Sequence, residues 1–348
     1  MSFGKGTPDL EAVLSLSGQN RNELEKVLKH YSHDSNEEKL RAAQFLVENM
    51  RWHASLVPIK KTHPSVLLNS LTHMADSLLY SCVKNVPKDS IGSRSLENEI
   101  AKVRHPFWLA NQERIKENKL YRPTQVKYDY EVLTADELIR HIDHIFYLRE
   151  NISVVRQLSF NDFCEFILPY RSISDFSLMD MPETYYKILG KYLDKLPQDS
   201  IANKANRYNF TLKNLKGFFP RYPYSAPIGY QELFFKGAYD CIPVAHYGAS
   251  TFRMLGIPSA VEYNVAYKQH QGTHYMCSVL MPDGKWMDFS PESGTPTVRQ
   301  NNDYKISGSM NVYRFMFSAQ KDTPFFVHGE GEFIPEELDC PFIKDVSS

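Results

Sequence analysis

Residues 240–263 read DCIPVAHYGASTFRMLGIPSAVEY, and this stretch decides the fold that we expect. Asp240 is a favourable N-cap, so Cys241 should open a helix. Gly256 suits the residue just past the helix end, and Pro258 stops the element. A cysteine at a helix start meets the positive end of the helix dipole and several free N–H groups. Both favour the reactive thiolate, and the N–H groups can also stabilise an oxyanion.

The stretch after this helix predicts strands. Apolar residues alternate over 261–267, and 273–281 should be a second strand that begins near His274. The residues of 282–284, Pro-Asp-Gly, indicate a three-residue hairpin loop with Gly284 in the left-handed conformation. Cys277 falls on the face opposite to His274, which predicts a core position. A base on a strand that faces a thiol at a helix start is what cysteine–histidine nucleophilic catalysis requires.

The same hairpin sets the register of the return strand. It should pair Ser278 with Asp288 and His274 with Glu292. Asp288 is the only aspartate on the face of His274, and we take it as the candidate that orients the imidazole. It stands too far along an ideal ladder and would need a bulge to come closer. Ser290 and Glu292 are the alternatives, and a carboxylate would stabilise imidazolium better than a hydroxyl.

The first 155 residues or so predict helices. Capping signals precede apolar positions at helical spacing, and we expect helices to start at Asn20–Glu23, Ser35–Glu38, Thr134–Glu137 and Ser159–Asp162, with a more apolar helix over 65–83. We therefore expect an α+β chain. Its parts would be a helical N-terminal region (1–155), a core that carries the cysteine (156–335), and a tail (336–348) that could lead into a further domain.

Composition excludes several classes of protein. The 348 residues include 40 Lys plus Arg against 41 Asp plus Glu, which gives no electrostatic reason to expect nucleic acid. Five cysteines without C-x-x-C spacing argue against a zinc ribbon. His141 and His144 share a side of a predicted helix, but no further ligands follow, so we expect a solvated face and no metal. No run reaches the roughly 20 apolar residues of a membrane helix, and no secretory signal is visible.

The stretches DCIPVAHYGASTFRMLGIPSAVEY and GTHYMCSVLMPDGKWMDFSPE together resemble the transglutaminase-like superfamily of papain-type cysteine folds. The shared features are a cysteine that opens a helix, R-x-L-G-I-P at the helix end (253–258), a histidine that begins a strand, and W-x-x-F-x-P (286–291). Two positions depart from the family pattern. Tyr275 stands where the family usually has Trp, and Ser290 stands where it usually has the third member of the triad.

The resemblance implies a helix packed on an antiparallel sheet, with Cys241 as nucleophile and His274 as base. It implies acyl transfer on a protein, peptide or glycoconjugate substrate, with hydrolysis favoured over cross-linking and no cofactor. The alternative is a catalytically silent module that binds peptide or glycan at a cell surface, and a purely structural domain is a third reading. The stretches NRNELEKVLKHY and SFNDFCEFILPYR look like secreted or surface proteins of Gram-negative gut bacteria. This implies a secreted, periplasmic or outer-membrane-anchored location, with the leader removed.

Overall fold

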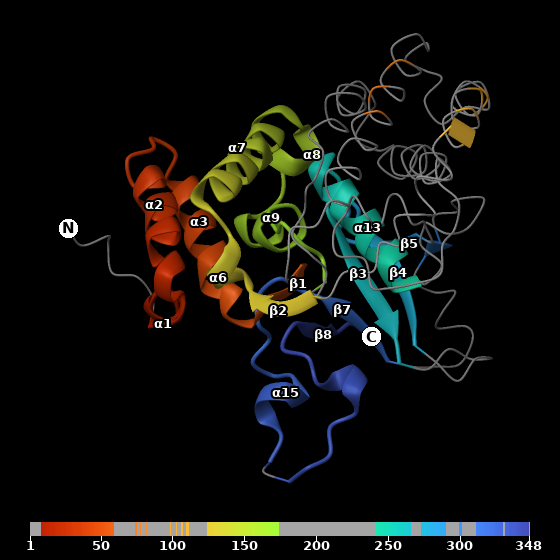
Figure 1. The fold of residues 1–348 in the computed structure, drawn as a ribbon. Coiled ribbons are helices and arrows are strands. Elements are labelled where there is room, and N and C mark those ends of the chain that lie inside the picture. The colour runs from red at the N-terminus through yellow and green to blue at the C-terminus, as the bar shows by residue number, and fades with distance from the viewer. Residues whose placement is uncertain are drawn as a thin grey trace.

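The computed structural model describes residues 8–58, 124–173, 241–265, 273–289, 299–300, 311–329 and 331–347, together with scattered helical positions between 74 and 110. In these parts the chain is α+β, as expected: helices accompany an antiparallel sheet (Figure 1). The expected helix over 65–83 lies mostly outside the described residues. Among the described residues, no helix is both long and apolar enough to cross a membrane.

The N-terminal region is a helical bundle (Figure 1). Its elements are α1 (Pro8–Leu16), η1 (Gly18–Asn20), α2 (Arg21–Tyr31), α3 (Glu37–Asn49), η2 (Met50–Trp52), α6 (Asp129–Val132), α7 (Ala135–Asn151), α8 (Ser153–Arg156) and α9 (Phe160–Phe166). A two-stranded antiparallel ribbon joins it, made of β1 (Ala54–Pro58) and β2 (Thr124–Tyr128). One buried apolar cluster runs through these helices, continues past residue 155 to Tyr170, and also takes in Met254 and Phe317. Helix α9 therefore packs with the N-terminal bundle.

Local signals placed the helix starts to within about two residues. Thr134 caps α7 in a capping box with Glu137, and Ser159 caps α9 by accepting from the Asp162 N–H at 3.0 Å. The expected start of α3 at Ser35 is shifted, because Asn36 accepts from the Glu38 N–H at 3.0 Å.

The first expected cap is used differently. The Asn20 side chain makes no capping bond to α2. Its amide instead donates to the carbonyls of Tyr130 at 3.0 Å and Leu133 at 2.8 Å. This residue therefore ties the start of α2 to the end of α6, more than a hundred residues along the chain.

The C-terminal half of the chain builds a six-stranded antiparallel sheet in the order β6-β5-β4-β3-β7-β8. Its strands are β3 (Ser259–Asn264), β4 (His274–Leu280), β5 (Trp286–Phe289), β6 (Arg299–Gln300), β7 (Val312–Phe315) and β8 (Ile343–Asp345). The last of these comes from the segment 336–348, which we expected to be a tail. Its backbone pairs with β7, so this segment supplies an edge of the sheet.

Helices lie on both faces of the sheet. Helix α13 (Cys241–Met254) runs along β3 and β4 (Figure 1) and is fixed to one face, where the Ser259 hydroxyl donates to the Ala249 carbonyl at 2.8 Å. Helix α9 meets the other face, where the Phe166 ring contacts the Trp286 ring edge-on at 4.8 Å. The strands of this central unit are thus enclosed between α13 and the N-terminal bundle.

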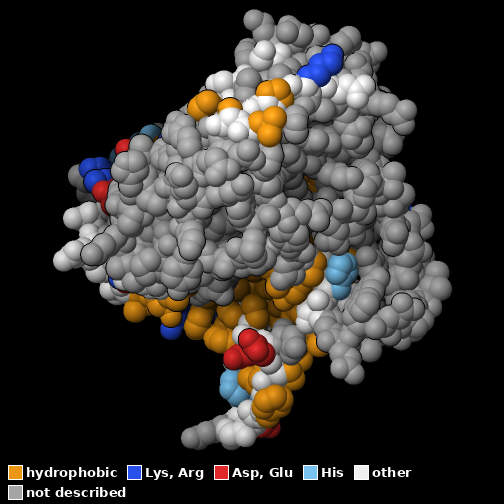
Figure 2. Space-filling view, turned by 45° about the vertical axis from the view of Figure 1, so that its right-hand side comes forward, with side chains coloured by type: hydrophobic (Ala, Val, Ile, Leu, Met, Phe, Trp, Pro, Cys, Tyr) orange, Lys and Arg blue, Asp and Glu red, His pale blue; other side chains and the backbone are white. Residues whose placement is uncertain are grey.

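A short arm between β7 and β8 projects from the rest of the molecule. It carries α15 (Pro324–Val327) and η6 (Glu336–Leu338), and Figures 1 and 2 show it at the lower edge. Phe333 is 89% exposed there, whereas Phe325 and Phe326 pack edge-on against Trp52.

Candidate active site

Helix α13 begins at Cys241, as the sequence predicts. Pro243 follows in the first turn, where a missing N–H breaks no intrahelical bond. The Cys241 thiol is half-buried and makes no disulfide, so it is partly open to solvent. Asp240, the expected N-cap, lies outside the described residues. The arrangement puts a sulfur at the positive end of a helix of 14 residues.

The other end of α13 is fixed by a Schellman motif. The Ile257 N–H donates to the Phe252 carbonyl at 2.8 Å, and the Gly256 N–H donates to the Arg253 carbonyl at 3.0 Å. Gly256 has a φ of 77°, which the sequence predicted for this position. A Cβ atom there would lie 2.4 Å from Ile152 Cδ1, so glycine is required both by conformation and by space.

Arg253 anchors this end to both neighbouring layers. Its side chain is 1% exposed; Nε donates to the Ser259 carbonyl at 2.8 Å and Nη1 donates to the Arg171 carbonyl at 2.7 Å. Burial lowers the pKa of its guanidinium to about 10, which leaves it cationic at neutral pH. Arg253 therefore has the structural role that its place at the helix end suggests.

The β4–β5 hairpin also forms as predicted. The Gly284 N–H donates to the Met281 carbonyl at 2.9 Å, the Met281 N–H donates to the Lys285 carbonyl at 2.8 Å, and Gly284 has a φ of 82°. Ser278 pairs with Asp288, which confirms the predicted register. Cys277 is fully buried, as a core position should be.

Topology brings Cys241 and His274 to the same end of the α13–β3–β4 unit. Helix α13 rises about 21 Å over its 14 residues, and β3 spans about 20 Å on the return. The start of the helix therefore comes level with the end of β3, where Asn264 pairs with His274. Both Cys241 and His274 are half-buried, so neither is sealed in the core.

The strand ladder puts His274 on the face turned away from α13. Asn264 and His274 are direct partners and share a face with Glu262, whereas Ser259, which bonds α13, points to the opposite face. The Asn264–His274 pair is also the last pair of the ladder. An imidazole here can meet the Cys241 sulfur only around the end of the sheet and not through the α13–sheet interface.

The register does not bring Asp288 to His274. Asp288 pairs with Ser278, which is four residues along β4 from His274, or about 13 Å. The described ladder from Leu280 to Cys277 is regular, with no bulge to shorten that separation. The alternatives, Ser290 and Glu292, lie outside the described residues.

His141 and His144, the two histidines that share a side of α7, have structural partners. His141 Nε2 bonds the Leu168 carbonyl at 2.7 Å, and His144 Nε2 bonds the Met254 carbonyl at 3.2 Å. The expectation of a solvated face is wrong here, because both imidazoles reach inward to a neighbouring segment. In the described parts of the chain, no cluster of three His, Cys, Asp or Glu residues could hold a metal ion.

His246, on α13, is buried and its Nδ1 bonds the Ser172 hydroxyl at 2.8 Å. Burial, followed by the charges of Arg171 and Arg253, lowers its pKa to about 3. This imidazole is neutral at physiological pH and joins α13 to the segment after α9.

Sequence reasoning missed a buried polar junction beneath α13. Arg171 Nη2 pairs with Asp129 Oδ1 at 2.7 Å, and both side chains are fully buried. Tyr170 donates to the other Asp129 oxygen at 2.8 Å, and Arg171 Nη1 donates to the Ala54 carbonyl at 2.7 Å. No local pattern marks these partners, which come from three separate segments. The junction holds the N-terminal bundle, the β1–β2 ribbon and, through the Arg171 carbonyl, α13.

A second missed cluster lies on the sheet face away from α13. Arg314 Nε donates to Glu262 Oε1 at 2.7 Å, and the Arg314 guanidinium lies 3.6 Å from the centre of the Trp286 ring. The signal available in the sequence was a glutamate between Val261 and Tyr263, in a stretch with a strand pattern.

The chain matches no family model, no curated protein and no solved structure.

Proposed function

We propose that this chain is a transglutaminase-like enzyme of papain-type fold that transfers acyl groups through a thiol, and that it hydrolyses amide or peptide bonds. The observation that carries the proposal is the placement of Cys241 at the start of α13, at the same end of the unit as His274. Thiol-based acyl transfer is also the chemistry implied by the resemblance to the transglutaminase-like superfamily, which rests on a cysteine that opens a helix and a histidine that begins a strand. A secreted or surface location belongs to the same proposal.

In the proposed reaction, the His274 imidazole takes the proton of the Cys241 thiol. The thiolate attacks a carboxamide or peptide carbonyl, and N–H groups in the first turn of α13 stabilise the oxyanion. The carbon–nitrogen bond breaks, His274 returns its proton to the leaving amine, and a thioester remains on Cys241. Water, deprotonated by His274, then hydrolyses the thioester to a carboxylate and restores the thiol.

The second candidate is a silent module that keeps this fold for binding. The orientation of His274 favours this second candidate, since the Asn264–His274 pair lies on the sheet face opposite to the one that α13 covers. An imidazole held there would face away from the helix that carries the thiol. Tyr275, at a position where the family usually has Trp, favours the same reading.

Site-resolved alkylation separates the two candidates. Iodoacetamide labelling would be followed at each cysteine by mass spectrometry from pH 5 to 9, in the wild type and in His274→Ala. Cys340 is also half-buried and serves as an internal reference thiol. His328→Ala is a matched control, because His328 is an exposed histidine on the projecting arm.

The enzyme proposal expects Cys241 to react at least about tenfold faster than Cys340 at pH 6, since an imidazole and a helix N-terminus would favour the Cys241 thiolate at that pH. His274→Ala should abolish that difference, and His328→Ala should preserve it. If Cys241 reacts no faster than Cys340 and is unaffected by His274→Ala, the enzyme proposal fails and the binding module replaces it.

A further inference from the structure

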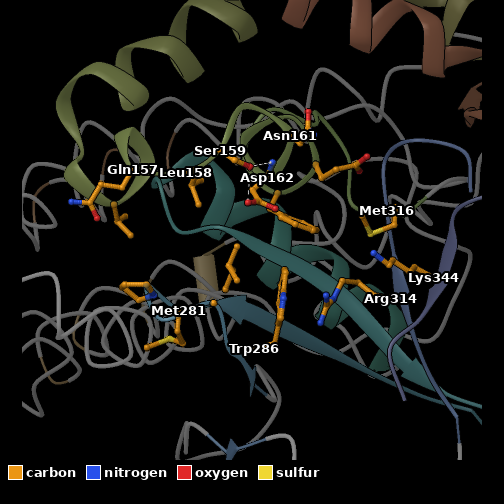
Figure 3. Close-up of a pocket in the computed structure, with 16 residues that line it drawn as sticks. Gln157, Leu158, Ser159, Asn161, Asp162, Met281, Trp286, Arg314, Met316 and Lys344 are labelled. Atoms are coloured by element: carbon orange, nitrogen blue, oxygen red, sulfur yellow. Dashed lines mark hydrogen bonds between the residues drawn. The ribbon is translucent and has the colours of Figure 1, made fainter. Parts of the chain in front are cut away.

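A cavity of about 540 Å³ lies between the N-terminal bundle and the sheet, on the face away from α13 (Figure 3). Helices α8 and α9 supply one wall, and the β4–β5 hairpin with β7 and β8 supplies the other. Leu280, which lines it, is six residues along β4 from His274, or about 20 Å. The cavity is thus separate from the proposed thiol site, and its volume suits a small organic ligand.

An indole ring in a fixed orientation lines the cavity. The Arg314 guanidinium lies 3.6 Å from the centre of the Trp286 ring, and Glu262 holds that guanidinium through Nε at 2.7 Å and Nη2 at 2.5 Å. Phe166 packs edge-on against the same ring at 4.8 Å. In Figure 3, Arg314 and Met281 lie on opposite sides of the indole. The ring is half-buried, so part of its apolar surface faces the cavity.

Planar polar side chains form the rim that α9 contributes. Asn161 is exposed at the cavity, and Asp162 beside it is half-buried (Figure 3). The Ser159 hydroxyl donates to Asp162 Oδ2 at 2.7 Å, which fixes the carboxylate and leaves its other oxygen to accept. These groups lie above the Trp286 ring and can hydrogen-bond the edge of a flat ligand.

A cation marks one end of the cavity. Lys344 is exposed on β8, directly opposite Arg314 on β7, and both side chains line the cavity. Its ammonium makes no hydrogen bond or ion pair with any residue that the structure describes, whereas Arg314 is paired with Glu262. Lys344 therefore presents a positive charge that no described carboxylate contacts, in a cavity that the carboxylates of Asp162 and Glu165 also line.

The walls recognise ligands through side chains and not through main-chain groups. Strands β4, β5 and β7 each pair on both sides, so most of their backbone N–H and C=O groups are used within the sheet. A peptide that binds by strand addition needs an open edge. These three strands do not offer one, and the cavity meets an edge of the sheet only at the short strand β8. An apolar ring surface beneath hydrogen-bonding amide and carboxylate groups instead suits a sugar, whose C–H face is apolar and whose edge carries hydroxyls.

We propose that this cavity binds a saccharide that carries a carboxylate, of the uronic acid class. The C–H face of the sugar lies on Trp286, its hydroxyls bond Asn161 and Asp162, and its carboxylate pairs with Lys344. This inference is independent of the proposed thiol chemistry, since no group at the Cys241 end takes part.

Ligand-observed NMR titrations with two matched sugar pairs test it. Methyl glucuronide and methyl galacturonide would each be compared with the neutral methyl glycoside, in the full chain, with an uncharged tripeptide as a further probe. At least one uronide should bind more tightly than its neutral parent. Lys344→Gln should weaken that uronide about fivefold and leave the neutral parent unchanged, as expected for an exposed ion pair.

Asn161→Ala should weaken the acidic and the neutral sugar alike, by about threefold, because it removes one neutral hydrogen bond. Both variants change exposed side chains and should fold, which circular dichroism verifies. Lys321→Gln, an exposed lysine outside the cavity, should change nothing. The proposal is overturned if no uronide binds, if Lys344→Gln has no effect, or if the tripeptide binds in place of the sugars.

Discussion

Asn264 and His274 face each other as the last pair of the β3–β4 ladder, on the sheet face turned away from α13. Strand ends are the one place where a side chain can bend around a sheet, since no further pair constrains it. Asn264 is 6% exposed, and its Oδ1 atom has no hydrogen-bond partner among the residues that the structure describes. A buried acceptor left open beside the proposed base is a feature of this end of the sheet that the proposed mechanism does not use.

The position of Asp288 predicts how much it contributes to thiol reactivity. Its separation from His274 along the ladder is about 13 Å, beyond the Debye length of about 8 Å at physiological ionic strength. Asp288→Asn should therefore leave the alkylation rate of Cys241 within about twofold of the wild type, whereas loss of a contacting triad carboxylate costs about 10⁴ in rate. Alkylation rates of Cys241 at pH 6 provide the measurement, and a drop of tenfold or more would show that the strand departs from this register.

The different exposure of two cysteines predicts effects of different size on stability for the same substitution. Cys241→Ser changes a half-buried thiol at a helix start and should alter the free energy of unfolding by less than about 0.5 kcal/mol. Cys164→Ser is the matched control. Cys164 is 2% exposed in the bundle core, and burial raises its pKa to about 12. A hydroxyl there should cost about 2 kcal/mol. Urea denaturation of both variants checks this, and a large loss in Cys241→Ser would mean that the site is sealed.

Several features that depend on local sequence were predicted correctly. Gly256 and Gly284 both adopt the positive φ that their turns require, and the helix of Cys241 starts where its sequence predicts. Such features depend on a few neighbouring residues, so the sequence alone determines them. The Ser278–Asp288 register followed from loop length for the same reason.

Partners far apart in the chain could not be predicted. Arg171 and Asp129 form a buried ion pair across 42 positions, and no periodicity marks either residue as buried. His141 and His144 lie on the polar side of a predicted helix, and only the packing of 168 and 254 against it turns them inward. The face of His274 likewise depends on which side of the sheet receives α13, and a strand pattern leaves that open.

A side chain at Gly256 should destabilise the protein for two reasons, backbone strain and a steric clash. Gly256→Ala combines a φ of 77° with a Cβ that would lie 2.4 Å from Ile152 Cδ1, and it should cost about 3 kcal/mol. Gly284→Ala is the control, since its φ is 82° but nothing lies within 4 Å, and backbone strain alone should cost about 1–2 kcal/mol. Adding Ile152→Ala to Gly256→Ala should cost less than the sum of the two single changes. Equal losses at the two glycines would show that the contact with Ile152 relaxes freely.

The buried imidazole of His246 predicts acid sensitivity. Its pKa is about 3 in the folded chain, against a reference value of 6.5. Between these two pH values the unfolded chain therefore binds a proton at His246 and the folded chain does not. The contribution of His246 to the free energy of unfolding is fully present above pH 6.5. It falls by about 1.4 kcal/mol per pH unit as the pH drops from 6.5 toward 3. Between pH 7 and pH 5 the loss is about 2 kcal/mol.

His246→Asn keeps a polar side chain that can meet the Ser172 hydroxyl but cannot titrate. The variant should lose less stability than the wild type between pH 7 and pH 5, with the difference equal to about one proton taken up on unfolding. Urea midpoints at both pH values measure it in each protein. Parallel pH dependence in the two proteins would mean that His246 is protonated in the folded chain, and that the Ser172 contact holds an imidazolium.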